Sequence, residues 1–274
     1  MTKKKKNNKY REAVLLLMGY SAVDTQKVFT KYVPLIVTTS LPYKSKEFSF
    51  SKNKTLNDKI DSILQSVSNE IYINCNYRAR QAAENAFKQE NRKVDSTVTS
   101  DFMKLKVEDY TVKERIDNYT SNFKKEIEAY IAIGFILDYS VSKIVGLWLS
   151  NKDKPFKSDI FNKYKDNISV EATKKGTETG RGVLQSSFAG EKEIEINNTF
   201  QSYNYTLNRI WNDDDDIAGW YTIRGSYYPC DYCDSQVGNF HDKSEWFYGY
   251  HPHCCCIMIP VTKEEKKSMG VNYP

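Results

Sequence analysis

The chain has 274 residues, of which 27% are charged and 40% are hydrophobic, and its formal net charge is +5. This length allows a large buried core in one or two domains, and the composition is typical of a globular protein rather than a disordered one. The charge is too small to demand a nucleic-acid partner, and because no run of about eighteen apolar residues occurs, no transmembrane helix is expected.

The first nine residues contain five lysines beside asparagine and threonine. Such a segment repels itself and buries no apolar surface, so residues 1–9 are predicted to form a disordered basic tail. Its densest part comprises Lys3, Lys4, Lys5 and Lys6. We interpret these lysines as solvated, with contact to nucleic-acid phosphates as the alternative.

Residues 10–155 are predicted to form a helical domain. The apolar residues at 13–23 begin a helix that is expected to end before Pro34, because proline breaks helix interiors. A second helix is expected from Thr55, as its cap, to about residue 92. Cys75 lies within this helix, far in sequence from the other cysteines, and is interpreted as a small buried residue.

Two further helices complete the predicted helical domain. Thr111 and Glu114 have the spacing of a capping box, and apolar residues at helical spacing follow them to Ile131. The last helix is expected over residues 138–149. These apolar stripes indicate surfaces for helix packing, without a recognisable cofactor motif.

Residues 156–274 are predicted to form a separate α+β domain, because the composition changes at the NKDKP segment, residues 151–155. Gly176, Gly180 and Gly182 lie among basic residues but match neither a P-loop nor a dinucleotide fingerprint, so a turn is predicted there. The acidic run 213–216 lacks the spaced oxygen ligands of a calcium loop and is interpreted as a solvated turn. The predicted fold class is α+β, predominantly helical, with a small C-terminal β-hairpin lobe.

Five of the six cysteines and all three histidines lie between residues 220 and 261. Cys230 and Cys233 form a C-x2-C pair, and seventeen residues later the chain reads HPHCCC from His251 to Cys256. Two cysteines separated by two residues supply two corners of a tetrahedron from one tight turn. Thiolate and imidazole donors favour zinc over magnesium or calcium, so a zinc-binding hairpin is predicted over 220–261.

The cluster offers more donors than one zinc ion needs. If the following CIMIPV segment is a strand, side chains alternate between its faces, and Cys254 and Cys256 point one way while Cys255 points the other. The expected ligands are Cys230, Cys233, His251 and one of Cys254 or Cys256. A closed structural site with one ion per chain is predicted, with an open catalytic site as the alternative.

A redox pair and disulfides are the competing interpretations of these cysteines. A redox C-x2-C pair typically occurs in a βαβ context, whereas the flanking segments here resemble two short strands joined by a long loop. Disulfides are typical of oxidising compartments, whereas this chain opens with MTKKKKNNKY and shows no apolar signal segment. Structural zinc is therefore the preferred interpretation.

Together, these residues resemble the phage head morphogenesis family, the Mu-F-like minor head proteins of tailed phages. The resemblance rests on an aromatic strand at 220–223, the C-x2-C knuckle, Gly238, the H-P-x-C-x-C box and a short apolar strand that reaches Pro260. Cys255 stands where the family usually has a basic residue. Upstream, the resemblance extends loosely from about residue 105, and Glu195 matches the family's glutamate.

The resemblance implies a non-enzymatic minor head protein that associates with the portal and capsid proteins during head assembly. It implies localisation in the virion after synthesis in the host cytoplasm, possible contact with packaged double-stranded DNA, and no membrane partner.

The alternative is a zinc-dependent nuclease or DNA-binding protein. A nuclease requires an open metal position and a general base, and His241 or His253 would transfer protons. The spacing disfavours it, because the cysteine-rich box offers one ion a full set of soft ligands. The sequence also shows no identifiable Ser-His-Asp arrangement.

Overall fold

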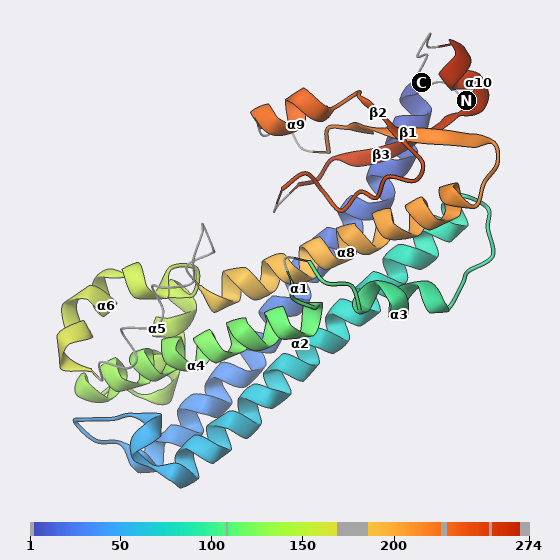
Figure 1. Ribbon diagram of the computed structural model, residues 1–274. Coiled ribbons are helices and arrows are strands. Elements are labelled where there is room, and N and C mark those ends of the chain that lie inside the picture. The colour runs from blue at the N-terminus through green and yellow to red at the C-terminus, as the bar shows by residue number, and fades with distance from the viewer. Residues whose placement is uncertain (1–2, 108, 169–185, 226–228, 252–253, 269–274) are drawn as a thin grey trace. The chain divides into compact units, whose positions relative to one another are not determined.

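The structure is a computed structural model that describes residues 3–107, 109–168, 186–225, 229–251 and 254–268. Long helices dominate the chain, and a small antiparallel sheet lies near its C-terminal end (Figure 1). The predicted fold class, α+β and predominantly helical, is therefore confirmed. No helix within the described ranges has both the length and the apolar character that a membrane crossing requires.

The described helices are α1 (Lys3–Ser40), α2 (Lys54–Gln89), α3 (Thr97–Met103), α4 (Val112–Ile136), α5 (Val141–Asn151), α6 (Asp159–Tyr164), α8 (Ser187–Asn212), α9 (Asp231–Gln236) and α10 (Lys263–Ser268). The strands are β1 (Ile217–Ile223), β2 (Phe240–Asp242) and β3 (Ile257–Thr262). The glycine-rich turn predicted around residues 176–182 lies outside the described residues.

The chain divides into two compact units that do not follow the predicted boundary at residue 155. Unit 1 comprises residues 1–21, 75–105 and 195–274, and unit 2 comprises residues 22–74 and 106–194. Three of the divisions fall inside α1, α2 and α8. The predicted boundary follows a local change in composition, whereas the two units depend on which distant segments pack together, and each of these helices belongs to both units.

Unit 2 has an aromatic and aliphatic core. Phe29 stacks on Trp148 at 5.5 Å between ring centroids and meets the edges of Phe123 and Phe188 at 4.8 and 5.4 Å. The predicted capping box forms at the start of α4, where the Thr111 hydroxyl accepts the Glu114 N–H and the Glu114 carboxylate accepts the Thr111 N–H. This cap fixes the first turn of the helix that carries much of the core.

Two predicted helix ends differ from the structure. Pro34 lies inside α1, which continues to Ser40, because Val33, Ile36 and Val37 around it are fully buried and their packing offsets the lost hydrogen bond. The second helix begins at Lys54 rather than at a Thr55 cap. The Asn53 carboxamide oxygen accepts the Leu56 N–H, so asparagine caps this helix.

The predicted disordered tail also differs from the structure, because α1 begins at Lys3. Lysine has a high intrinsic helix propensity, and residues 3–9 extend the helix that the apolar residues after them form by packing. Lys3, Lys4, Lys5 and Lys6 are therefore helical in backbone conformation.

In unit 1, α8 is buried although many of its residues are polar. Asn198 and Ser202 donate hydrogen bonds to the carbonyl oxygens of Cys75 and Ala79, and Ser21 bonds to Thr199. Buried polar groups are tolerated when such bonds satisfy them. Cys75 is fully buried, as predicted.

The sheet has the strand order β2-β1-β3, so β1 is central and both neighbours are antiparallel to it. The predicted hairpin is therefore a three-stranded sheet. Trp220 lies opposite His241 on β2 and Pro260 on β3. The acidic run before β1 is a turn as predicted, and within it the Asp214 carboxylate pairs with Arg92.

Candidate metal centre

The C-x2-C pair lies at the start of the short helix α9, after the end of β1. Cys230 is the N-cap residue, and its sulfur accepts the backbone N–H of Cys233 at 3.5 Å. The cap places the second thiol one helical turn from the first. Both sulfur atoms therefore lie at the start of α9.

The long loop between β2 and β3 brings the second half of the motif back to α9. Two amide side chains on α8 hold this loop: Asn208 donates to the Glu245 carbonyl oxygen and accepts the Phe247 N–H, and Gln201 donates to the Tyr248 carbonyl oxygen. Tyr250 bonds to Thr222 on β1 at 2.7 Å. These bonds place the chain immediately before His251.

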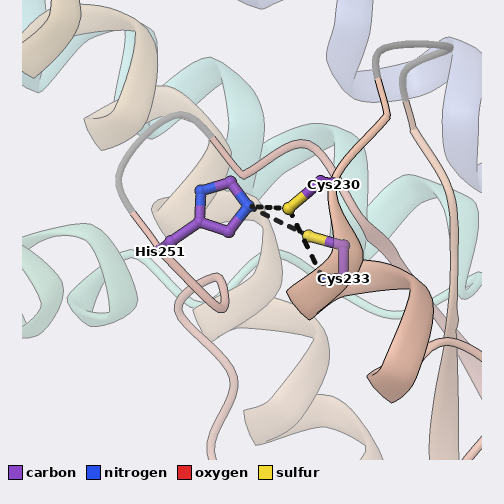
Figure 2. Close-up of side chains that lie close together, drawn as sticks. All are labelled: Cys230, Cys233 and His251. Atoms are coloured by element: carbon purple, nitrogen blue, oxygen red, sulfur yellow. Dashed lines mark hydrogen bonds between the residues drawn. The ribbon is translucent and has the colours of Figure 1, made fainter.

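His251 meets both thiols of the C-x2-C pair. Figure 2 shows the two sulfur atoms pointing toward the same ring nitrogen, with distances from Nε2 of 3.3 Å to Cys230 Sγ and 3.0 Å to Cys233 Sγ. The ligand atoms of these three residues lie within 4.8 Å of one another. They therefore form one potential metal-binding group.

A second group overlaps the first at Cys233. Its sulfur lies 4.0 Å from that of Cys254, and the sulfurs of Cys233, Cys254 and Cys256 lie within 4.8 Å of one another. All three residues are buried, whereas Cys255 is partly exposed and belongs to neither group of described residues. The predicted alternation of Cys254 and Cys256 with Cys255 therefore agrees with the structure.

These distances fit a tetrahedral metal centre. With zinc–sulfur bonds of about 2.3 Å and zinc–nitrogen bonds of about 2.0 Å, neighbouring sulfurs lie about 3.8 Å apart and sulfur and nitrogen about 3.5 Å apart. The Cys233–Cys254 distance of 4.0 Å is slightly longer, and the two distances to His251 are a few tenths of an ångström shorter. The cluster is therefore compatible with a bound metal ion.

The protonation of the thiols is uneven. Hydrogen bonds from the Cys256 thiol and from backbone N–H groups lower the pKa of Cys254 to about 5, and the backbone N–H of Cys233 lowers the pKa of Cys230. Burial raises the pKa of Cys233 to about 12, and the bond to Cys254 raises that of Cys256. A metal ion that binds these sulfurs displaces the remaining protons.

His241 does not belong to the cluster of described residues. The His241 ring stacks on Trp220 at 4.2 Å between centroids, and its Nδ1 bonds to the Glu245 carboxylate at 3.0 Å. His253 lies outside the described residues, and the side chains of Lys3 to Lys6 are likewise not described. Glu195 is fully buried within α8.

Arg224 contacts the site although no sequence motif pointed to it. Its guanidinium donates to the Cys230 carbonyl oxygen at 3.3 Å and pairs with Asp234 at 3.3 Å. A single arginine after a predicted strand gives no signal of such a contact, because the contact depends on where the strand ends.

Comparisons with protein-family models, with curated proteins and with solved structures find no match for this chain.

Proposed function

We propose that Cys230, Cys233, His251 and one of Cys254 or Cys256 bind one structural Zn²⁺ ion per chain. The observation that carries this proposal is the convergence of these donors from two segments separated by seventeen residues. Sulfur and imidazole donors suit zinc, and four protein ligands on one ion are typical of a structural rather than a catalytic zinc site. When bound, the ion joins α9 to the chain that enters β3.

We further propose that the chain is a minor head protein of a tailed phage, which binds portal and capsid proteins during head assembly and is retained in the virion. The support is the resemblance of the knuckle, Gly238 and the H-P-x-C-x-C box to the head morphogenesis family. The cluster geometry is compatible with it, because the cysteines and His251 of that motif converge. In this role the zinc is structural, and packaged double-stranded DNA is a possible further partner.

Native mass spectrometry of the purified chain tests the zinc proposal. One zinc ion per chain is expected. Cys230→Ser is expected to lose both the ion and the folded structure of the segment around the proposed site, residues 220–261. Cys256→Ser, compared with Cys254→Ser, identifies the ligand that completes the site. A wild-type chain without bound metal would overturn the assignment.

Co-purification with the portal protein encoded by the same genome tests the assembly proposal. Tagged portal rings are expected to retain the wild-type chain and to lose the Cys230→Ser variant. A well-folded, zinc-loaded chain that binds neither portal nor capsid protein contradicts this role.

Among the described residues, His241 lies outside both metal-binding groups, so the described geometry does not favour the nuclease alternative. Incubation of the zinc-loaded chain with supercoiled plasmid tests it. Metal-dependent nicking that His241→Ala abolishes would replace the structural proposal with the enzymatic one.

A further inference from the structure

Arg224 directly follows β1 and lies against the C-x2-C knuckle. One guanidinium nitrogen, Nη1, lies 3.3 Å from the Cys230 carbonyl oxygen and 3.3 Å from the Asp234 carboxylate. These two residues flank the first turn of α9, since Cys230 is its N-cap and Asp234 follows Cys233. The side chain is 23% exposed, so most of it is shielded from water.

The next residue, Gly225, contacts the other half of the cluster. A Cβ atom built at this glycine would lie 1.5 Å from the carbonyl oxygen of Cys255, so the two backbones touch. The dipeptide Arg224-Gly225 therefore contacts both ligand-bearing segments. Any side chain at 225 would push the HPHCCC segment away from β1.

The arginine is charged where it contacts the knuckle. Burial lowers the pKa of Arg224, but the charges of Asp234, Cys256 and Cys233 outweigh this effect, so the pKa is raised. The guanidinium therefore carries its positive charge at any pH at which the protein folds.

The proposed ligand set creates a charge that needs compensation. Three thiolates, one neutral imidazole and a dication leave one net negative charge, and two of the thiolates are buried. An uncompensated charge in a poorly hydrated site is costly. Residues that do not bind the metal themselves, but orient its ligands or balance their charge, commonly determine the metal affinity.

We propose that Arg224 is a positioning residue that balances the charge of the thiolate cluster and thereby sets its affinity for zinc. This inference rests on the proposed zinc site. The pairing with Asp234 alone does not account for the placement of Arg224, because Asp234 is 56% exposed and solvent-exposed ion pairs contribute little.

Competition with a chromophoric chelator, performed on the full-length chain with Zn²⁺, measures the affinity. Arg224→Gln is expected to weaken zinc binding by roughly 10- to 100-fold, and Arg224→Lys to restore most of the loss because it keeps the charge. Asp234→Asn is expected to bind zinc at least as tightly as wild type, since it removes only a competing carboxylate. Arg92→Gln, which removes another arginine–aspartate pair from unit 1, is the matched control and is expected to change nothing.

Each outcome separates this inference from the proposal on which it rests. A wild-type chain that binds no zinc overturns the proposed function. A zinc-binding wild type with an Arg224→Gln affinity within about twofold of it overturns the role of Arg224 alone. If Arg224→Lys and Asp234→Asn both bind zinc as weakly as Arg224→Gln, Arg224 acts by fixing the geometry of the knuckle, and charge balancing is overturned. Circular dichroism tests whether each variant is folded. If Arg224→Gln does not fold, Arg224→Lys is the decisive variant.

Discussion

Cys233 is the residue on which the proposed metal centre depends most, because its sulfur belongs to both overlapping groups of potential donors. Cys233→Ser is therefore expected to abolish metal binding, whereas Cys255→Ser, at a partly exposed thiol outside the described cluster, is expected to retain one ion per chain. Elemental analysis of the purified variants measures this difference. Metal retained by Cys233→Ser would contradict the site.

Glu126 is a second residue whose environment predicts a measurable effect. It is 2% exposed, and burial raises its pKa from the ordinary 4.5 to about 8, although the N–H and hydroxyl of Ser187 donate hydrogen bonds to it. Because the folded pKa is raised, the folded state holds a proton that the unfolded state has lost above about pH 4.5. Stability is therefore expected to fall, by on the order of 4 kcal/mol in total, as the pH rises from about 4.5 to 8.

The substitution Glu126→Gln tests this prediction, because glutamine is neutral and keeps an oxygen that accepts both bonds. Urea unfolding between pH 5 and 8 is expected to show a flatter pH dependence than wild type. Glu47→Gln, at an exposed carboxylate in the same unit, is the control and is expected to keep the wild-type slope. If the free energy of unfolding of Glu126→Gln depends on pH as steeply as that of wild type, Glu126 is not the group responsible.

Sequence spacing predicted that the cysteines and His251 converge, because a C-x2-C pair places two sulfurs in one tight turn and Cys254 and Cys256 alternate with Cys255. The contacts of Arg224 and Gly225 could not be predicted from the sequence, for the opposite reason. Their contacts with the knuckle and with Cys255 depend on how the sheet ends against a loop, and α8 side chains far away in sequence hold that loop.

At the scale of single elements, β1 contains a glycine that cannot be replaced without moving the sheet. A Cβ atom at Gly219 would lie 2.0 Å from the His241 backbone oxygen, whereas one at Gly146 in α5 would meet no atom within 4 Å. Gly219→Ala is expected to destabilise the protein by about 2 kcal/mol, and Gly146→Ala to stabilise it by about 0.5–1 kcal/mol. Thermal unfolding distinguishes the two, and equal effects would contradict the strand pairing.

Helix ends show which local signals are reliable. The Thr111 capping box formed as predicted because its hydrogen bonds involve only residues three apart. The helix break at Pro34 was wrong because buried neighbours decided the outcome. The Asn53 cap was missed because Asn53 and Thr55 both suit the position, and sequence alone does not choose between them.

At the scale of the whole molecule, the proposed metal ligands all belong to unit 1, whereas unit 2 contains none of them. Chelation of the proposed zinc is therefore expected to expose the amides of β1 and β3 to hydrogen exchange while α4 and α5 keep their protection. Hydrogen-exchange mass spectrometry with and without chelator measures this difference. Equal loss of protection in both units would mean that the metal supports the entire fold.

The division of the chain was the least predictable feature. A boundary near residue 155 follows from composition, but units 1 and 2 alternate along the sequence, and α1, α2 and α8 each contribute to both. A local shift in composition carries no information about which distant segments pack together.

This alternation has a consequence for synthesis. Every segment of unit 2 has been translated by residue 194, whereas unit 1 still lacks α8 beyond its first turns, the sheet and the proposed zinc ligands. Unit 2 can therefore acquire its core while residues 195–274 are still being added, before the proposed zinc ligands have been made. With the proposed zinc site, scarcity of zinc during expression is therefore expected to lower the yield of folded unit 1 while unit 2 still forms its core.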